Sequence, residues 1–453
     1  MTALDRATTE AALRACEAAL ARNPGDVVAW HNKGVELRRL DRLDDAIVAI
    51  ERALDGGLRA PETRTMRAHL LADLGRFDEA VAQYQSLLAD HPDLIDAHET
   101  LSRLLPQIGR RAEAFDAYHQ SLARAPGSGL LWMSALGVAK DLRDSEQLLG
   151  LVANAEMRFG SEPLLTILAA QAHSWRGEDR TALDKLAGAI AIEPHNAAAH
   201  ATIAQISVRT RDFAKAESAA LTATQLAPDD QTAWALLTVI WRLTADPREH
   251  WLADYDRLVM EIDLDGIDLA GTAEALSLLH RTLEHPAEQS LRGGTQTRGT
   301  LFDRADSVIT ALRLKIADGV SLSLAGLPTD ATHPFLRRNS GRFAFAGSWS
   351  VRLRSRGNHI SHIHPAGWLS SAAYIHLPPE IAVNDHAGAL AFGVPEALLD
   401  LDMLPRRVVA ARPGKLVLFP SYLWHATTPF ESEQPRLTVA FDAVPMDNAA
   451  PQR

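Results

Sequence analysis

Apolar positions in the first half of the chain recur with a period of 34 residues. The recurring positions are Ala46, Ala80 and Ala114, then Ile50, Tyr84 and Tyr118 four residues later, and finally Pro92 and Pro126. After a slip near Gly160 the same step links Ala182 to Ala216. A small residue, a large apolar residue one turn later and a closing proline predict pairs of closely packed helices. We therefore expect residues 1–245 to form an α-solenoid with a concave groove.

The pattern loses this period between residues 246 and 345, which we interpret as a connector. The segment Asp246–Thr282 remains helical in its apolar spacing, apart from the turn-rich stretch Asp263–Asp268. The polar, glycine-rich run Gln289–Arg298 has neither a helical nor a strand period, so it predicts a loop. A helical period returns at Phe302–Ala317.

Alternating apolar and polar residues mark the last part of the chain, residues 346–453, as a β domain. The predicted strands are Ser348–Leu353, Leu369–Leu377, Ala387–Phe392, Arg407–Ala411, Lys415–Phe419, Leu423–Ala426 and Leu437–Phe441. Many short strands without intervening helices favour two packed antiparallel sheets. The predicted fold class is α + β multidomain, with an N-terminal α-solenoid followed by a C-terminal double-stranded β-helix, or jelly roll.

Composition excludes several functional classes. The net charge of −11, without a run of Lys or Arg, argues against binding to nucleic acid or to an anionic membrane. The single cysteine, Cys16, cannot form an internal disulfide. The first residues, MTALDRATTE, lack the features of a signal peptide, and no apolar run is long enough to span a bilayer. We expect a soluble, cytoplasmic protein.

The densest candidate chemistry lies between Asn358 and Thr438. His362 and His364 are separated by one residue, so on an extended strand both rings would face the same side. His425 ends a later strand and can complete a metal site, because imidazole suits Fe(II), Zn, Cu or Ni. Arg436 and Thr438 are also two apart. An arginine fork beside a hydroxyl suits a bound carboxylate.

The chain resembles two known families. The period and the Ala, aromatic and Pro positions of residues 1–245 resemble tetratricopeptide repeats. From about residue 289 onward the chain resembles the Fe(II)/2-oxoglutarate-dependent dioxygenases, in a bacterial branch fused to such repeats. The matching motifs are HIHPAGWLSSAAYIHLP, GALAFG, GKLVLFPSYLWHATTPF and RLTVAFD.

This resemblance implies a set of metal ligands. His425 corresponds to the distal ligand, and His362 or His364 corresponds to the proximal one. Most of the superfamily has an acidic residue where this chain has His364. Either His364 replaces the acid, or His359 and His362 bind the metal with His364 behind them, or Asp385 supplies a carboxylate from a loop.

The resemblance also implies the cosubstrate contacts. Arg436 and Thr438 would hold the distal carboxylate of 2-oxoglutarate, with Tyr374 as a further contact. The remaining candidates for outer-sphere or substrate contacts are His359, Arg292, Gln296, Trp368 and Trp424.

The expected function is a hydroxylase that uses Fe(II) and 2-oxoglutarate and acts on a protein or peptide recruited by the repeat groove. Binding of a second copy of the chain is a further possible use of the repeats. The alternative is a non-catalytic interaction scaffold that carries a metal-binding, cupin-like jelly roll.

Overall fold

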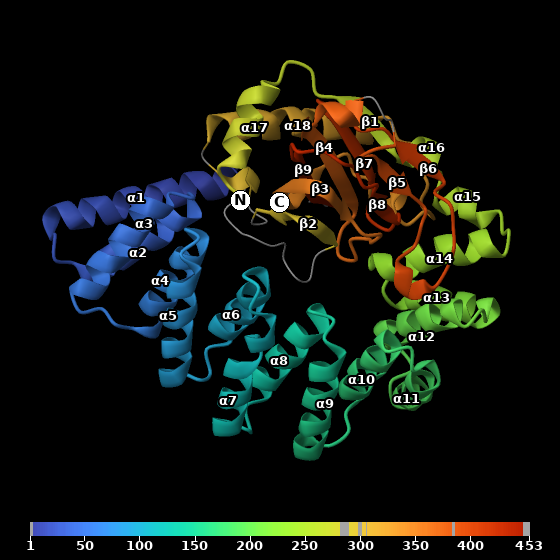
Figure 1. Ribbon diagram of the computed structural model, residues 1–453, viewed down its shortest axis with the longest axis horizontal. Coiled ribbons are helices and arrows are strands. Elements are labelled where there is room, and N and C mark those ends of the chain that lie inside the picture. Colours follow the sequence, from blue (N-terminus) through green and yellow to red (C-terminus); the bar gives the residue numbers. More distant parts are fainter. Residues whose placement is uncertain (1–2, 281–289, 298–300, 305, 383–385, 447–453) are drawn as a thin grey trace, which may run out of the picture. The chain divides into compact units, whose positions relative to one another are not determined.

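The computed structural model describes residues 3–280, 290–297, 301–304, 306–382 and 386–446 (Figure 1). The chain divides into two compact units. The first comprises residues 1–142 with 280–288 and 300–310. The second comprises residues 143–279, 289–299 and 311–453. The domain boundaries expected at residues 245 and 345 stay a prediction.

The first unit is built from antiparallel helix pairs. Its helices are α1 (Ala3–Arg22), α2 (Val27–Arg39), α3 (Leu43–Asp55), α4 (Pro61–Asp73), α5 (Phe77–Asp90), α6 (Ile95–Gln107), the short η1 (Arg111–Glu113), α7 (Asp116–Arg124) and α8 (Gly129–Asp141). Ala46 and Ala80 are fully buried at the helix contacts, as the 34-residue period predicts. Gly34 also allows close approach, because a Cβ atom there would lie 2.6 Å from Ile50.

Buried polar side chains also join successive helices of this unit. His69 on α4 is 2.6 Å from the Tyr84 hydroxyl on α5 and 2.8 Å from the Asp96 carboxylate on α6. Tyr118 on α7 bonds to Ser134 on α8 at 2.6 Å. His98 stacks on Tyr118 with ring centroids 4.5 Å apart. These histidines therefore act as packing residues.

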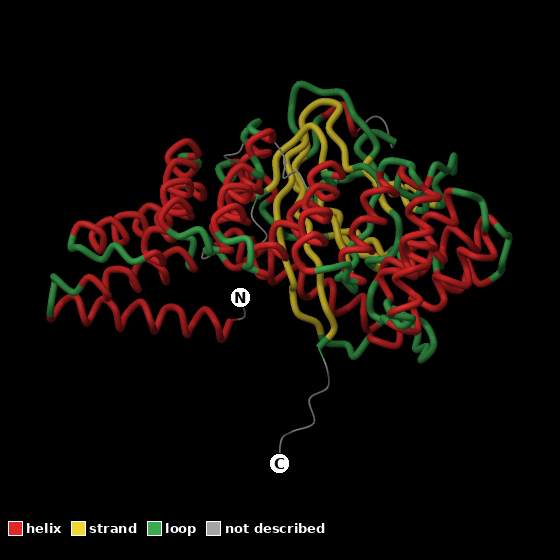
Figure 2. The backbone as a smooth tube through the Cα atoms, turned by 90° about the horizontal axis from the view of Figure 1, so that it is seen from below, coloured by secondary structure: helices red, strands yellow, loops and turns green. Residues whose placement is uncertain are grey.

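Two antiparallel sheets form the core of the second unit (Figure 2). The larger has the order β1-β7-β4-β9-β3-β2 and the smaller the order β6-β5-β8. The strands are β1 (Met260–Asp263), β2 (Leu291–Gln296), β3 (Phe343–His359), β4 (Leu369–His376), β5 (Leu390–Phe392), β6 (Arg407–Val409), β7 (Lys415–Pro420), β8 (His425–Thr427) and β9 (Arg436–Pro445). The predicted jelly-roll type of architecture agrees with these two sheets.

Two edge strands correct the sequence predictions. Met260–Asp263, predicted as helix, forms β1 and pairs with β7. In this strand the Ile262 side chain packs near Gly319 of α18, and this contact stabilises the extended conformation of residues 260–263. Leu291–Gln296, predicted as a loop, forms β2 and pairs with β3. The pairing shifts register between Arg292 and Gly294, and this irregularity hides the strand period.

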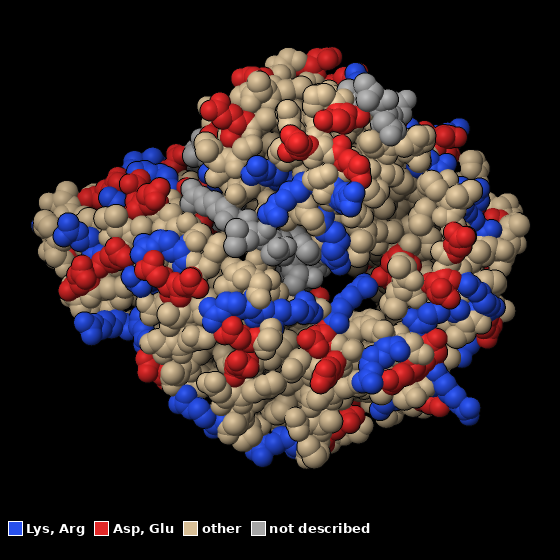
Figure 3. All heavy atoms as spheres, viewed as in Figure 1, with Lys and Arg blue, Asp and Glu red and all other residues tan. Residues whose placement is uncertain are grey.

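Helices cover the outer face of the large sheet. These helices are α17 (Leu269–Ser277) and α18 (Ser307–Ala325), while the short elements α15 (Arg248–Leu252), α16 (Tyr255–Leu258), η2 (Leu301–Asp303), η3 (Leu336–Arg338), α19 (Pro379–Ala382) and η4 (Ala397–Leu399) lie between the larger ones. On the face shown in Figure 3, basic and acidic side chains are interspersed. None of the helices in the described ranges is long and apolar enough to cross a membrane.

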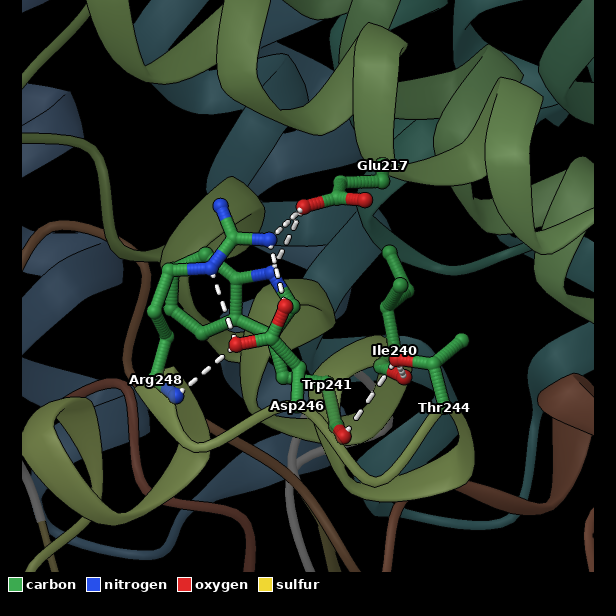
Figure 4. A network of polar contacts seen from close by, with 6 residues as sticks. All are labelled: Glu217, Ile240, Trp241, Thr244, Asp246 and Arg248. Carbon is green, nitrogen blue, oxygen red and sulfur yellow. Dashed lines mark hydrogen bonds and ion pairs between the residues drawn. The ribbon is translucent and has the colours of Figure 1, made fainter.

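The second unit also contains further repeat helices. They are α9 (Ser145–Phe159), α10 (Pro163–Trp175), α11 (Asp179–Ile192), α12 (Ala197–Arg209), α13 (Phe213–Leu226) and α14 (Gln231–Leu243). A network of polar contacts joins α13 and α14, the last helix pair (Figure 4). The indole of Trp241 donates to Glu217 at 2.9 Å, and the Arg248 guanidinium lies 4.6 Å from the Trp241 ring centroid. Arg248 also bonds to Asp246 at 2.6 Å.

Candidate metal centre

Three histidines from two segments converge at one point of the second unit. One ring nitrogen from each of His362, His364 and His425 lies within 4.8 Å of the others. The Nε2 atoms of His362 and His364 are 3.3 Å apart. His362 and His425 also pair through both of their backbone groups, each N–H donating to the other's carbonyl at 3.1 Å.

The prediction that His362 and His364 share a strand is wrong. β3 ends at His359, and His362 forms only an isolated bridge with His425. Pro365 lacks an N–H and Gly367 follows in a tight turn, so the ladder cannot continue. A Cβ atom at Gly367 would lie 2.4 Å from the Ser421 hydroxyl, which makes glycine necessary at this approach. The two rings still lie close together, with centroids 5.2 Å apart.

Hydrogen bonds leave the Nε2 atom of each ring available to a metal ion. Nδ1 of His362 donates to the Ile360 carbonyl at 2.8 Å, and Nδ1 of His425 donates to the Leu423 carbonyl at 2.9 Å. A carbonyl can only accept, so both rings carry their proton on Nδ1 when neutral. This is the tautomer that presents an Nε2 lone pair. The Nε2 atom of His362 also lies 3.3 Å from that of His364, so a single cation can contact both nitrogens.

A carboxylate fixes the third ring. Nδ1 of His364 lies 2.7 Å from an Asp442 carboxylate oxygen, and the other oxygen accepts from Ser370 at 2.7 Å. Ser421 continues the chain at 2.8 Å from Ser370. The Trp349 ring stacks beside His364 with centroids 6.1 Å apart. His364 is therefore held in one orientation by polar and aromatic neighbours.

Burial and charge shift the pKa values within the cluster. Burial, reinforced by the neighbouring His364, lowers the pKa of His362 to about 3. Burial and the other two rings also hold the pKa of His425 well below its ordinary value. Burial alone would lower the pKa of His364, but the Asp442 carboxylate reverses this and raises it. The cluster thus favours neutral rings at positions 362 and 425 and a carboxylate-polarised ring at position 364.

His359 lies beside the cluster without joining it. Its ring stacks on His362 with centroids 5.7 Å apart, and its Nδ1 is 2.9 Å from the Ser290 hydroxyl. The three rings that come within 4.8 Å of one another do not include His359. The alternative ligand Asp385 lies outside the described residues.

Arg436 and Tyr374 form a second polar group in the same domain. The Arg436 side chain is buried, its Nε donates to the Gly388 carbonyl at 3.2 Å, and its guanidinium lies 5.0 Å from the Tyr374 ring centroid. No carboxylate of the described residues pairs with Arg436. The Tyr374 hydroxyl is buried beside this guanidinium; burial raises the pKa of Tyr374, and the charge of Arg436 partly offsets that rise. Thr438 faces both, since its Cα is in register with Tyr374.

Comparisons with known proteins agree with this architecture. Residues 347–442 match the family model described as "Putative 2OG-Fe(II) oxygenase". Residues 65–129 and 180–240 match two tetratricopeptide repeat models. The chain thus matches tetratricopeptide repeats in its first part and the "Putative 2OG-Fe(II) oxygenase" model near its C-terminal end. No curated protein matches the chain.

Solved structures of tetratricopeptide repeat proteins resemble part of the chain. One, from Parabacteroides merdae ATCC 43184, is 18% identical with a TM-score of 0.34, and the match covers 52% of this chain and 94% of that one. Another is the C-terminal part of a repeat protein from Cytophaga hutchinsonii. It is 15% identical with a TM-score of 0.39, and the match covers 51% of this chain and 95% of that one.

The remaining candidate residues of the oxygenase domain lie either in the core or on strand β2. Trp368 packs against Phe335 and donates to its carbonyl at 3.0 Å, and Trp424 donates to the Ala235 carbonyl at 2.9 Å. Arg292 lies opposite Asn358 on β2, and Gln296 lies toward the far end of that strand. Both tryptophans are thus core residues.

Asp442 is the residue that sequence reasoning missed. It ends the motif RLTVAFD, and strand alternation from Arg436 places residues 438, 440 and 442 on the same face. That alternation was the available signal. One face of β9 thus carries Arg436 at one end and the partner of His364 at the other.

Proposed function

We propose that this protein is an Fe(II)- and 2-oxoglutarate-dependent oxygenase that acts on a protein or peptide bound by its repeats. The observation that carries the proposal is the convergence of one ring nitrogen from each of three histidines, in rings whose Nδ1 atoms are already hydrogen-bonded. The match of residues 347–442 to the oxygenase family supports the choice of metal and cosubstrate.

His362, His364 and His425 would hold the metal ion. Three imidazoles on one side of an ion leave positions open for small ligands, as an oxygenase requires. None of the three carries a negative charge, so Asp442 supplies the nearest carboxylate through the His364 ring. Such an outer carboxylate orients its histidine and increases the basicity of the ligating nitrogen.

Arg436, Thr438 and Tyr374 would hold the distal carboxylate of 2-oxoglutarate. A buried guanidinium without an acidic partner in the described chain is costly unless an anion binds it. The buried Tyr374 hydroxyl lies against the same guanidinium and can donate to the same anion. Burial lowers the pKa of Arg436 but the group stays cationic, because arginine begins from a very high value.

When bound, the iron and 2-oxoglutarate would supply oxidation of a substrate C–H group by dioxygen, with one oxygen atom going to the substrate and the other to succinate, and with loss of CO₂. The protein's own task is to orient the cosubstrate between the histidine cluster and Arg436, and to keep water from the reacting atoms. Buried side chains beside the cluster, among them Phe392 and Phe419, exclude water: their ring centroids lie 6.4 and 4.6 Å from that of His425.

The repeats would supply the substrate. Tetratricopeptide repeats generally bind proteins or peptides, and both repeat matches lie outside the oxygenase domain. A substrate as small as a free amino acid would not need an array of repeats to bind it. We therefore propose a polypeptide substrate, with self-association of the chain as the competing use of the repeats.

Succinate formation from 2-oxoglutarate tests this function. The purified full chain is incubated with Fe(II), ascorbate, oxygen and 2-oxoglutarate, and succinate is measured. We expect turnover in the wild type, and loss of most of it in His425→Ala and Arg436→Ala. Asp265→Asn, a change at an exposed residue outside the two groups, serves as the control. Metal binding without turnover would instead support the non-catalytic scaffold, and equal turnover in all variants would refute the site assignment.

A further inference from the structure

Each of the three candidate metal ligands has a sequence neighbour that is bonded to a part of the chain outside the ligand segments. The neighbour of His425 is Trp424, and the neighbour of His364 is Pro365. Both are bonded to α14, the last helix of the repeats. The neighbour of His362 is Ser361, which donates to the Val394 carbonyl.

Trp424 makes the most specific of these contacts. Its indole is buried and donates to the Ala235 carbonyl at 2.9 Å. Ala235 lies in the middle of α14, where its carbonyl also accepts from the Thr238 hydroxyl at 2.7 Å. If the indole donor is removed, the Ala235 carbonyl therefore keeps a hydrogen-bond partner. Only the hydrogen bond between α14 and the residue next to His425 is lost.

Pro365 makes the second contact through its backbone. The N–H of Gln231 donates to the Pro365 carbonyl at 3.0 Å. Asp230 is the N-cap of α14, so Gln231 is its first residue and its N–H has no partner within the helix. The start of α14 thus uses one of its free N–H groups to fix the turn that carries His364.

The segment after β5 provides the third link. Gly393 donates its N–H to the Trp424 carbonyl at 2.9 Å. Arg242 of α14 donates to the Gly393 carbonyl at 2.8 Å, and Gln205 of α12 donates to Glu396 at 2.8 Å. The residues next to His362 and His425 are therefore connected to two repeat helices through one short segment.

From these contacts we propose that α14 is a structural part of the metal centre, and that Trp424 and Gln231 are positioning residues for its ligands. The stability of α14 and the binding of the metal ion are then thermodynamically coupled. The metal affinity depends on the position of α14, and metal binding in turn stabilises α14, because coupling between two sites is reciprocal. This inference uses only the metal-binding part of the proposed function.

Conservative variants at both contacts test the proposal. Trp424→Phe keeps an aromatic ring and removes the donor. Gln231→Pro removes the N–H at a helix position where proline is favoured, and Asp230 already has the extended conformation that a following proline requires. The matched controls are Trp234→Phe, whose indole donates to Pro228 at 3.0 Å on the same helix, and Ala197→Pro at the equivalent first position of α12. Gln231→Ala controls for loss of the Gln231 side chain.

The measurement is titration of the metal-free full chain with Mn(II) and with Co(II). The Co(II) absorption spectrum reports ligand geometry, and a thermal melt of each metal-free variant reports stability. We expect about fivefold or greater weakening of metal binding and an altered Co(II) spectrum in Trp424→Phe and Gln231→Pro. Binding by the three controls should stay within about twofold of the wild type. Metal binding should also slow amide hydrogen exchange in α14 of the wild type.

The outcomes separate this inference from the proposed function. Wild-type affinity and spectrum in both test variants would overturn the inference, even if the protein turns over 2-oxoglutarate. Weakening of the controls to the same degree would overturn it as well, because the effect would then be general destabilisation. Metal binding with the expected variant pattern but without succinate formation would refute the oxygenase function and leave the inference intact. A wild type that binds no metal would refute both.

Discussion

The Asp442 carboxylate lies 2.7 Å from Nδ1 of His364, although the two residues are 78 positions apart. Burial alone would raise the pKa of Asp442, but the charge and hydrogen bond of His364 lower it. Ser370 satisfies the second carboxylate oxygen. The proposed metal site therefore has its nearest negative charge on Asp442, one imidazole ring away from the proposed position of the ion.

Replacement of Asp442 should weaken metal binding. In Asp442→Asn the ring of His364 loses its carboxylate partner, and its Nε2 becomes a poorer donor to a metal ion. We expect a loss of about 10-fold to 100-fold in Mn(II) affinity, measured by titration.

Asp96→Asn is the matched control for this change. Its carboxylate also contacts a histidine, His69 at 2.8 Å, but within the repeats of the first unit. Mn(II) affinity should be unchanged in this variant. Equal losses in both variants would contradict a specific role for Asp442.

Removal of the Tyr374 hydroxyl should separate cosubstrate binding from stability. The hydroxyl is buried beside the Arg436 guanidinium and makes no close hydrogen bond in the described chain, so Tyr374→Phe should change the free energy of unfolding by less than about 1 kcal/mol. The KM for 2-oxoglutarate should rise several-fold, with unchanged Mn(II) affinity. Urea unfolding and initial-rate kinetics measure the two effects. A lower stability with an unchanged KM would show that the hydroxyl is purely structural.

The metal-free protein should lose stability in acid. Burial, then the charge of His364, lowers the pKa of His362 to about 3, and burial also lowers that of His425. The unfolded chain binds protons on these rings below about pH 6.5, whereas the folded chain does not. The raised pKa of His364 acts in the opposite direction, but only above about pH 6.5. Stability should therefore fall as the pH decreases from about 6.5 toward 3.

Urea unfolding in the presence of a chelator, across this pH range, measures the effect. His362→Asn should unfold with a shallower pH dependence, because it removes one group that must gain a proton on unfolding. An unchanged slope in this variant would contradict the assignment of a neutral, buried ring at position 362.

The helix contacts of the first unit predict a clear pair of stability effects. Ala80 is fully buried at its helix contact, whereas Ala82 on the same helix is exposed. Ala80→Leu should cost about 1–3 kcal/mol through overpacking. Ala82→Leu should change the free energy of unfolding by less than about 0.5 kcal/mol. Chemical denaturation monitored by circular dichroism distinguishes the two, and equal stabilities would contradict the repeat register.

The sequence predicted the features that depend on local periodicity. The 34-residue step located the helix pairs, because each pair needs a small residue at its contact. Two-residue alternation located most strands of the jelly roll, as at Leu369–His376. The residues of the histidine cluster could also be predicted from the sequence, because His362, His364 and His425 lie in recognisable motifs.

The missed features depend on long-range pairing. β1 and β2 are edge strands whose identity follows from their partners, and the glycines in β2 remove its alternation. The pairing of His362 with His425, which brings the two ligand segments together, is equally absent from any local period. The link from Trp424 to Ala235 joins residues 189 positions apart, and no local pattern specifies such a contact.

The central claim is that His362, His364 and His425 together bind one metal ion, with His359 outside the ligand set. The most direct measurement is titration of the metal-free chain with Mn(II) for the wild type and for the four single His→Ala variants. We predict one ion per chain in the wild type, a loss of affinity of about 100-fold or more in each of the three ligand variants, and a change of less than about 10-fold in His359→Ala. Retained binding in His364→Ala, together with its loss in His359→Ala, would contradict this account.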